Sequence, residues 1–180
     1  VSALLDSAVD LMRYRLTKGD DVSLVVESDP VVPEVVGDFQ QLTQVLVNLI
    51  SNARDAMEGI DARERRRTLT VRARSSADWV ILEVQDNGGG VPPELGDKIF
   101  EPFVTTKEPG RGTGLGLYIS RQIIEGHRGS LTYESKRGEG TTFRLRLPIA
   151  PESTDESETA PPEMEPERSP CKRILIVDDE

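Results

Sequence analysis

Cysteine and histidine are almost missing from this sequence of 180 residues, which holds one of each, Cys171 and His127. One cysteine cannot form a disulfide within the chain, and a single histidine leaves no His/Cys zinc site. The sequence thus excludes a disulfide framework and a metal centre of that type, and it fits a reducing compartment.

Long apolar runs are also missing. No stretch is long enough to span a bilayer, and no signal peptide is recognisable. We therefore expect this piece to be soluble and cytoplasmic, even if a longer parent protein is anchored in a membrane.

A basic surface is lacking as well. The arginines at 63 and 65–67 form a short run that Glu64 dilutes, which is typical of a solvated loop. The net charge of −10 comes mainly from residues 151–180, which hold 10 acidic and 3 basic side chains, against 22 and 19 in residues 1–150. No nucleic-acid partner is therefore expected.

Glycine, by contrast, is concentrated between Asp86 and Leu117. Clusters at 88–90 and 110–116 flank an aromatic-bearing segment, and the second cluster leads into the apolar start of a predicted helix. Glycines let backbone N–H groups turn toward an anion, and the first turn of a helix adds unpaired donors. Neither G-x-x-x-x-G-K-[ST] nor G-x-G-x-x-G occurs. The stretch suits phosphate, and the alternative is a mobile loop without chemistry.

Hydrophobic periodicity predicts a chain of alternating helices and strands. We expect helices at 2–15, 38–59 and 115–125, and strands at 22–27, 68–74, 79–84, 131–134 and 141–147, the last two as a hairpin. Asp38 is the expected N-cap of the longest helix. The apolar residues expected to be buried on the three helices are Leu4, Leu5, Ala8, Leu11 and Met12; Leu42, Val45, Leu46, Leu49, Ile50, Ala53 and Met57; and Leu117, Ile119, Ile123 and Ile124.

Polar residues also recur along one side of the longest helix, at Gln44, Asn48, Asn52 and Asp55. Asparagine is a poor residue for a helix interior, so two of them one turn apart call for an explanation. An amide oxygen can complete the shell of a magnesium ion that phosphates partly ligate. Metal or nucleotide contact and chance placement both remain open on this pattern alone.

The composition changes sharply after residue 150. Residues 150–171 are rich in Pro, Glu, Ser and Thr, which predicts a flexible acidic linker because little apolar area is there to offset the entropy of ordering. Residues 172–180 include RILIVDDE, an apolar strand ending in paired carboxylates, and we interpret it as the start of a further domain.

Together these blocks resemble the catalytic, ATP-binding domain of a sensor histidine kinase, over residues 1–149 including a first helix at 1–16. NLISNARDAM resembles the N box of that family, DNGGG and GRGTGLGL its two glycine boxes, IFEPFVTTK its F box and GEGTTF its last block. The resemblance implies the Bergerat fold of the GHKL superfamily, an α/β two-layer sandwich (α+β) in which a mixed, largely antiparallel sheet packs on helices. RILIVDDE resembles the first strand of a receiver domain, which implies a hybrid kinase.

The resemblance also assigns roles to single residues. Asn52 matches the asparagine that ligates Mg²⁺, with Asn48 one turn earlier, and Asp86 matches the aspartate that accepts a hydrogen bond from the adenine amino group. Thr141 matches the threonine that supports adenine recognition. Lys107 and Arg111 lie in the segment 105–114 that resembles the mobile ATP lid, and they are candidates for phosphate contact. The remaining nucleotide-binding positions implied are Gly88, Gly90, Gly112, Thr113, Gly114, Leu115 and Gly116.

Two positions depart from the family. Asp55 stands where many members carry a basic residue that reaches the phosphates. The phosphoacceptor histidine is absent, because His127 is followed by Arg128 in a predicted turn and is interpreted as a structural or capping residue.

The resemblance implies transfer of the γ-phosphoryl group of ATP to a histidine on an upstream dimerisation domain, and relay to an aspartate of a receiver domain, either attached or on a separate response regulator. A homodimer is expected only through that upstream domain. The alternatives are a gyrase-type ATP hydrolase and a non-catalytic nucleotide-binding module. The hydrolases carry a glutamate where Asn48 stands, and an amide cannot serve as a general base.

Overall fold

The computed structural model describes residues 1–150 except 19–21, 61–64 and 108–111. It contains the helices α1 (Ser2–Lys18), α2 (Phe39–Ala56) and α3 (Gly116–Gly126) and a short 3-10 helix, η1 (Gly96–Phe100). The strands are β1 (Ser23–Ser28), β2 (Thr68–Ser76), β3 (Trp79–Asp86), β4 (Ser130–Lys136) and β5 (Gly140–Pro148). Cys171 and the predicted linker and receiver strand lie outside the described residues.

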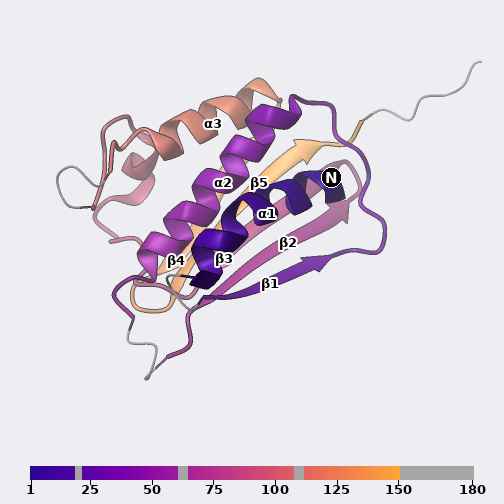
Figure 1. Ribbon diagram of the computed structural model, residues 1–180. Coiled ribbons are helices and arrows are strands. Elements are labelled where there is room, and N and C mark those ends of the chain that lie inside the picture. Colours follow the sequence, from indigo (N-terminus) through magenta and orange to yellow (C-terminus); the bar gives the residue numbers. More distant parts are fainter. Residues whose placement is uncertain (19–21, 61–64, 108–111, 151–180) are drawn as a thin grey trace, which may run out of the picture.

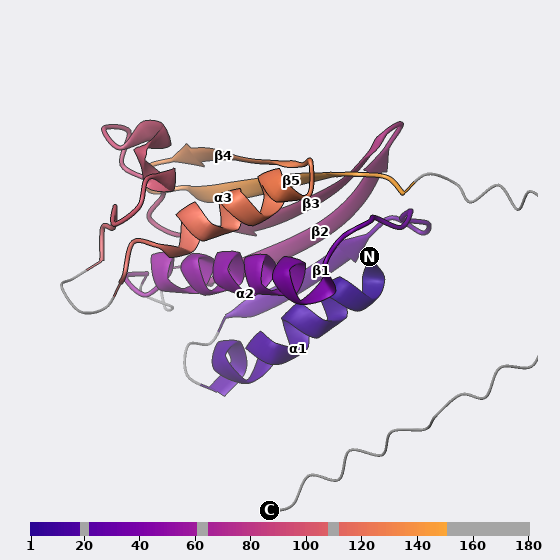
Figure 2. The ribbon, with the colours of Figure 1, turned by 90° about the horizontal axis from the view of Figure 1, so that it is seen from above.

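The five strands form one sheet in the order β1-β2-β3-β5-β4. β1 pairs with β2 in parallel, and the other neighbours are antiparallel. All three helices lie on one face of the sheet, with α2 between α1 and α3 (Figures 1 and 2). The predicted two-layer arrangement with a mixed, largely antiparallel sheet is therefore confirmed.

The alternation of side chains along the strands produces the two layers. On β3, Val80, Leu82 and Val84 are buried beneath the helices, whereas Glu83 points to the opposite face. There Glu83 accepts a hydrogen bond from Arg144 of β5 at 2.9 Å. Because the period is two residues, Asp86 at the end of β3 must face the helices, which brings a carboxylate to the core side of the sheet.

Helix α2 is the centre of the helical layer. All seven residues of its predicted apolar stripe are buried, none being more than 4 % exposed. Each large apolar side chain buried in this way contributes about 1.5–3 kcal/mol, which outweighs the few tenths of a kcal/mol that asparagine costs in a helix. The helix starts where predicted, since the Asp38 carboxylate accepts hydrogen bonds from the N–H groups of Gln40 and Gln41 at 2.8 and 3.0 Å.

Several boundaries and two burial predictions were wrong. α2 ends at Ala56, not near Gly59, because the N–H groups of Met57 and Glu58 bond back three residues and tighten the chain into turns. α1 runs three residues further than expected. Leu11 and Ile119 are 62 % and 41 % exposed, since each lies on the side of its helix away from α2 and the sheet.

Strand ends also differ in a way that matters for the site. β3 extends two residues beyond the predicted 79–84, and β5 begins at Gly140, so that Asp86 pairs with Thr141 in the ladder. The hydrogen-bonding pattern of the sheet thus carries both residues to one edge of the helical layer.

Candidate nucleotide-binding site

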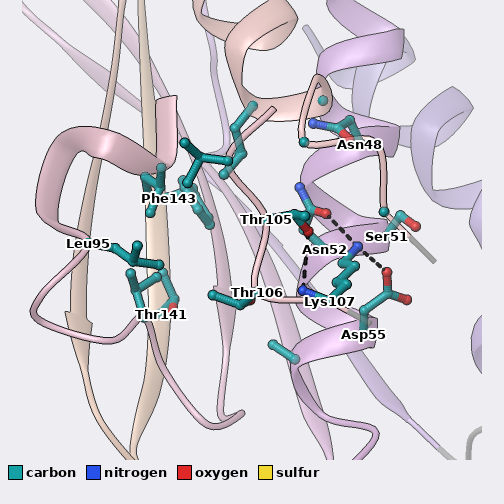
Figure 3. Close-up of a pocket in the computed structure, with 18 of the residues that line it drawn as sticks. Asn48, Ser51, Asn52, Asp55, Leu95, Thr105, Thr106, Lys107, Thr141 and Phe143 are labelled. Atoms are coloured by element: carbon teal, nitrogen blue, oxygen red, sulfur yellow. Dashed lines mark hydrogen bonds and ion pairs between the residues drawn. The ribbon is translucent and has the colours of Figure 1, made fainter. Parts of the chain in front are cut away.

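A cavity of about 780 Å³ opens between α2, the adjoining ends of β3 and β5, the start of α3 and the segment from Gly90 to Lys107. Its size falls within the range of small-molecule sites. Figure 3 shows its two ends: Leu95, Thr141 and Phe143 on the sheet side, and Asn48, Asn52, Asp55 and Lys107 along α2.

The sheet end combines a buried carboxylate with apolar walls. Asp86 is 4 % exposed, and its Oδ1 accepts a hydrogen bond from the N–H of Gly88 at 2.7 Å. Burial raises the pKa of Asp86 to about 6, although hydrogen bonds from backbone N–H groups, including that of Gly88, oppose the rise. Apolar side chains line the same end of the cavity, among them Val91, Leu95 and Phe143. An acceptor within an apolar slot fits a flat, aromatic ligand that carries an amino group.

The α2 end is polar and carries opposite charges. The Nζ of Lys107 donates to Asn52 Oδ1 at 3.1 Å and to Asp55 Oδ2 at 2.5 Å. Asp55 Oδ1 also accepts from Arg54 at 2.6 Å. Burial raises the pKa of Asp55, but the hydrogen bonds from Lys107 and Arg54 and the charges of these two residues outweigh it and lower the pKa overall. Asp55 is therefore the anionic centre of a cluster with two cations.

The first turn of α3 closes the cavity between these ends. Gly116, its first residue, lies so close to Asn48 that a Cβ there would collide with the Asn48 Oδ1. The Asn48 amide in turn donates to Ser120 Oγ of α3 at 3.0 Å. Gly114 has a φ of 66°, which an L side chain rarely adopts, and it packs on the backbone of Phe103. Glycine thus lets the helix start approach α2, where its unpaired N–H groups can face an anion.

Most predicted site residues line this one cavity. They are Asn48, Asn52, Asp86, Gly90, Lys107, Gly112, Thr113, Gly114, Gly116 and Thr141. Gly88 and Leu115 are not on its wall: Gly88 packs beneath Asp86 against the Ala56 carbonyl, and Leu115 precedes α3. Arg111 lies outside the described residues. Gln44 is exposed and does not line the cavity, although it shares the polar periodicity of α2.

The sequence did not reveal Ser51, Arg54 or the apolar wall as parts of the site. Ser51 and Arg54 lie beside the Asn48–Asn52 row on α2, and both line the cavity. Their one signal in the sequence was their position next to that row. Leu95 belongs to the approach to η1, which no periodic pattern predicted.

His127 takes no part in the cavity. Its Nε2 accepts a hydrogen bond from the N–H of Asp38 at 2.9 Å, so the proton of the neutral ring is on Nδ1, which donates to the Ile123 carbonyl at 2.7 Å. The side chain therefore joins the end of α3 to the start of α2, in the structural role predicted for it.

In the described part of the chain, no group of three or more His, Cys, Asp or Glu side chains could hold a metal ion without further ligands. Asn52 nevertheless offers an amide oxygen at the polar end of the cavity, the kind of ligand that Mg²⁺ takes when phosphates supply the remainder. Among the described helices, none combines the length and the apolarity needed to cross a membrane.

The family follows from comparison with known sequences. A family model described as "Histidine kinase-, DNA gyrase B-, and HSP90-like ATPase" matches residues 37–151. The chain belongs to this family. Within it, the chain is an ATPase domain of the kind found in two-component sensor histidine kinases.

Two curated relatives and one solved structure illustrate the likeness. The two-component sensor PprA of Pseudomonas aeruginosa is 49 % identical over 117 residues, which cover 64 % of this chain and 13 % of PprA. The sensor kinase CckA of Brucella abortus is 39 % identical over 193 residues, covering 98 % of this chain and 20 % of CckA. The catalytic domain of histidine kinase ThkA superposes with a TM-score of 0.71 at 30 % identity, covering 83 % of this chain and 95 % of that domain. This chain thus spans only 13 % and 20 % of the length of the two curated relatives.

Proposed function

We propose that this chain binds ATP with Mg²⁺ and transfers the γ-phosphoryl group to a histidine of an upstream dimerisation domain. One observation carries the proposal: a single cavity joins a buried carboxylate in an apolar slot to a polar end with an asparagine, a lysine and a helix N-terminus. These two ends suit the adenine and the triphosphate of one ligand.

Each part of the cavity has a distinct task in this proposal. Asp86 accepts a hydrogen bond from the adenine amino group, with Thr141 beside it in the ladder and Gly90 at the cavity wall. Asn52 offers its amide oxygen to the metal, and Lys107 neutralises phosphate charge. Bound Mg²⁺ would offset the charge of the phosphates, and the N–H groups of Gly114 and Gly116 would help to hold the phosphates in place. Such transfer depends on positioning and charge neutralisation.

The geometry at Asn48 disfavours the gyrase-type alternative. Its amide nitrogen donates to Ser120 and its oxygen packs against Gly116, so the side chain supports the start of α3. An amide cannot accept a proton from water at neutral pH, and water attack would therefore lack its general base. A non-catalytic module, the other alternative, is disfavoured because Asn52, Lys107 and the glycines at 112, 114 and 116 all line the phosphate end of the cavity.

The partners follow from the same proposal. The acceptor histidine belongs to a dimerisation domain upstream, through which the parent protein would dimerise. The segment 172–180 would open a receiver domain after an acidic linker, which makes the parent a hybrid kinase acting in a phosphorelay. A separate response regulator is the other receiver candidate: the related kinase ThkA has been solved in complex with the response regulator protein TrrA. ATP is available in the cytoplasm, so we propose that the reaction takes place there.

Calorimetric titration of ATP and ADP into this chain, with Mg²⁺ and with EDTA, tests the proposal. We expect binding of both nucleotides, tighter with Mg²⁺, and at least tenfold weaker binding for Asp86→Ala in both conditions. Labelled ATP should leave no acid-labile phosphate on the chain itself and should label an added dimerisation domain from the parent protein. The proposed nucleotide site would be refuted if the unsubstituted 180-residue chain bound neither nucleotide. It would also be refuted if the Asp86→Ala variant bound them as tightly as the unsubstituted chain.

A further inference from the structure

Lys107 bridges two oxygens that differ in kind. Its ammonium group contacts the neutral amide oxygen of Asn52 and the carboxylate of Asp55, one helical turn further along α2 (Figure 3). The lysine side chain is 32 % exposed and that of Asp55 19 %, so the pair is partly shielded from water. Arg54 binds the other oxygen of the same carboxylate. Because the pair is partly shielded, water weakens the attraction between Asp55 and Lys107 less than it would weaken that of a fully exposed ion pair.

The position of the ammonium group coincides with that required of a metal. In the proposed function the metal of a nucleotide binds the Asn52 amide oxygen, which Lys107 occupies in this structure. A monovalent and a divalent cation that share one oxygen lie a few ångströms apart, where their repulsion is strong in a site shielded from water. Binding of one at Asn52 thus requires the other to move away.

We propose that Lys107 and the nucleotide-bound Mg²⁺ exchange at the Asn52 oxygen, and that Asp55 is the positioning residue that holds Lys107 there before the exchange. Arrival of the metal displaces the ammonium group from Asn52 and from Asp55, and Lys107 becomes available to the phosphates. The acidic residue at position 55 accordingly opposes Mg²⁺-nucleotide binding and makes Lys107 engage phosphate only when metal is present. This inference rests on the proposed function and deepens it.

The exchange predicts that removing the charge of Asp55 changes nucleotide affinity when Mg²⁺ is present and leaves it almost unchanged when the metal is removed. Asp55→Asn keeps the shape of the side chain and removes its charge, so the tether to Lys107 is lost. We expect this variant to bind Mg²⁺-ATP about threefold to tenfold more tightly than the parent, which corresponds to about 0.7–1.4 kcal/mol. Binding of ADP in EDTA should change less than twofold, because no cation then competes for Asn52. Both constants are measured by calorimetry on the 180-residue chain.

Simple loss of negative charge near the phosphates could also tighten binding, and a double-mutant cycle separates the two causes. The effect of Asp55→Asn is measured again in a Lys107→Met background, where no ammonium group remains to be tethered. We expect the tightening to fall below twofold there. Without nucleotide, amide exchange at residues 104–107 should be faster in Asp55→Asn than in the parent, because the tether is gone.

Three results would overturn the inference. Weaker Mg²⁺-ATP binding by Asp55→Asn would make Asp55 a metal ligand, and unchanged binding would make the ion pair a bystander. If Asp55→Asn still tightened Mg²⁺-ATP binding in the Lys107→Met background, the cause would be the lost repulsion between the Asp55 carboxylate and the phosphates. The same titrations include Asp86→Ala. If this variant binds nucleotide like the unsubstituted chain, the proposed function fails; if it binds more weakly and only the Asp55 results disagree, the exchange alone fails.

Discussion

Replacing Asp86 with asparagine should stabilise the folded chain at neutral pH while weakening nucleotide binding. The carboxylate is 4 % exposed, and burial raises its pKa from 3.8 to about 6. Each pKa unit corresponds to about 1.36 kcal/mol, so the ionised form costs the folded state up to about 3 kcal/mol above pH 6. Asparagine has nearly the same shape, and its oxygen can still accept the Gly88 N–H without carrying a buried charge.

The direction in which the free energy of unfolding changes with pH shows whether the buried charge of Asp86 is responsible for the difference in stability. Between about pH 4 and pH 6 the folded chain keeps a proton on Asp86 that the unfolded chain has lost, so its free energy of unfolding falls as the pH rises. The Asp86→Asn variant has no carboxyl group at this position, so it lacks this contribution to the pH dependence. Its stability should match that of the parent near pH 4, and its advantage should grow to about 2–3 kcal/mol by pH 7.5.

Urea unfolding of both proteins across that pH range, followed by circular dichroism, measures the difference. In parallel, calorimetry at pH 7.5 should show at least tenfold weaker ADP binding for the variant, because the amide NH₂ would face the adenine amino group if the oxygen keeps its bond to Gly88. An Asp86→Asn chain less stable than the parent at pH 7.5, or a stability difference that does not change with pH, would refute the burial argument.

Three further substitutions test other parts of the site. Asn52→Ala should weaken ATP binding about tenfold with Mg²⁺ and less than twofold in EDTA, and equal losses in both conditions would contradict a metal-ligating role. Gly116→Ala should lower the free energy of unfolding by about 1–3 kcal/mol in a urea titration, since its Cβ must displace Asn48; an unchanged midpoint would show that α3 shifts freely. His127→Ala should cost about 1–2 kcal/mol by removing the acceptor of the Asp38 N–H, yet leave ADP affinity unchanged, because Asp38 is at the opposite end of α2 from Asn52. Loss of ADP binding in a folded His127→Ala chain would show that this contact reaches the site.

Much of the fold was predictable because it depends on local periodicity and capping. The stripe of α2 repeats at helical spacing, its start needs only the Asp38 carboxylate and the N–H groups that follow it, and the strands alternate along their length. Where a helix lies at the edge of the helical layer, as α1 and α3 do, periodicity cannot tell which flank of its apolar stripe is covered. Leu11 and Ile119 fit the apolar pattern of their helices and are nevertheless exposed.

By itself, the sequence determined the helices and strands to within a few residues, the glycine-rich approach to α3 and, through its resemblance, the family. The tertiary structure alone decided which distant groups meet: Lys107 with Asp55, 52 residues apart, and the Asp38 N–H with His127, 89 residues apart. Local propensity acts over a few residues. The partner of a buried charge depends instead on how sheet register and helix packing fold the chain back on itself, and no spacing in the sequence records that choice.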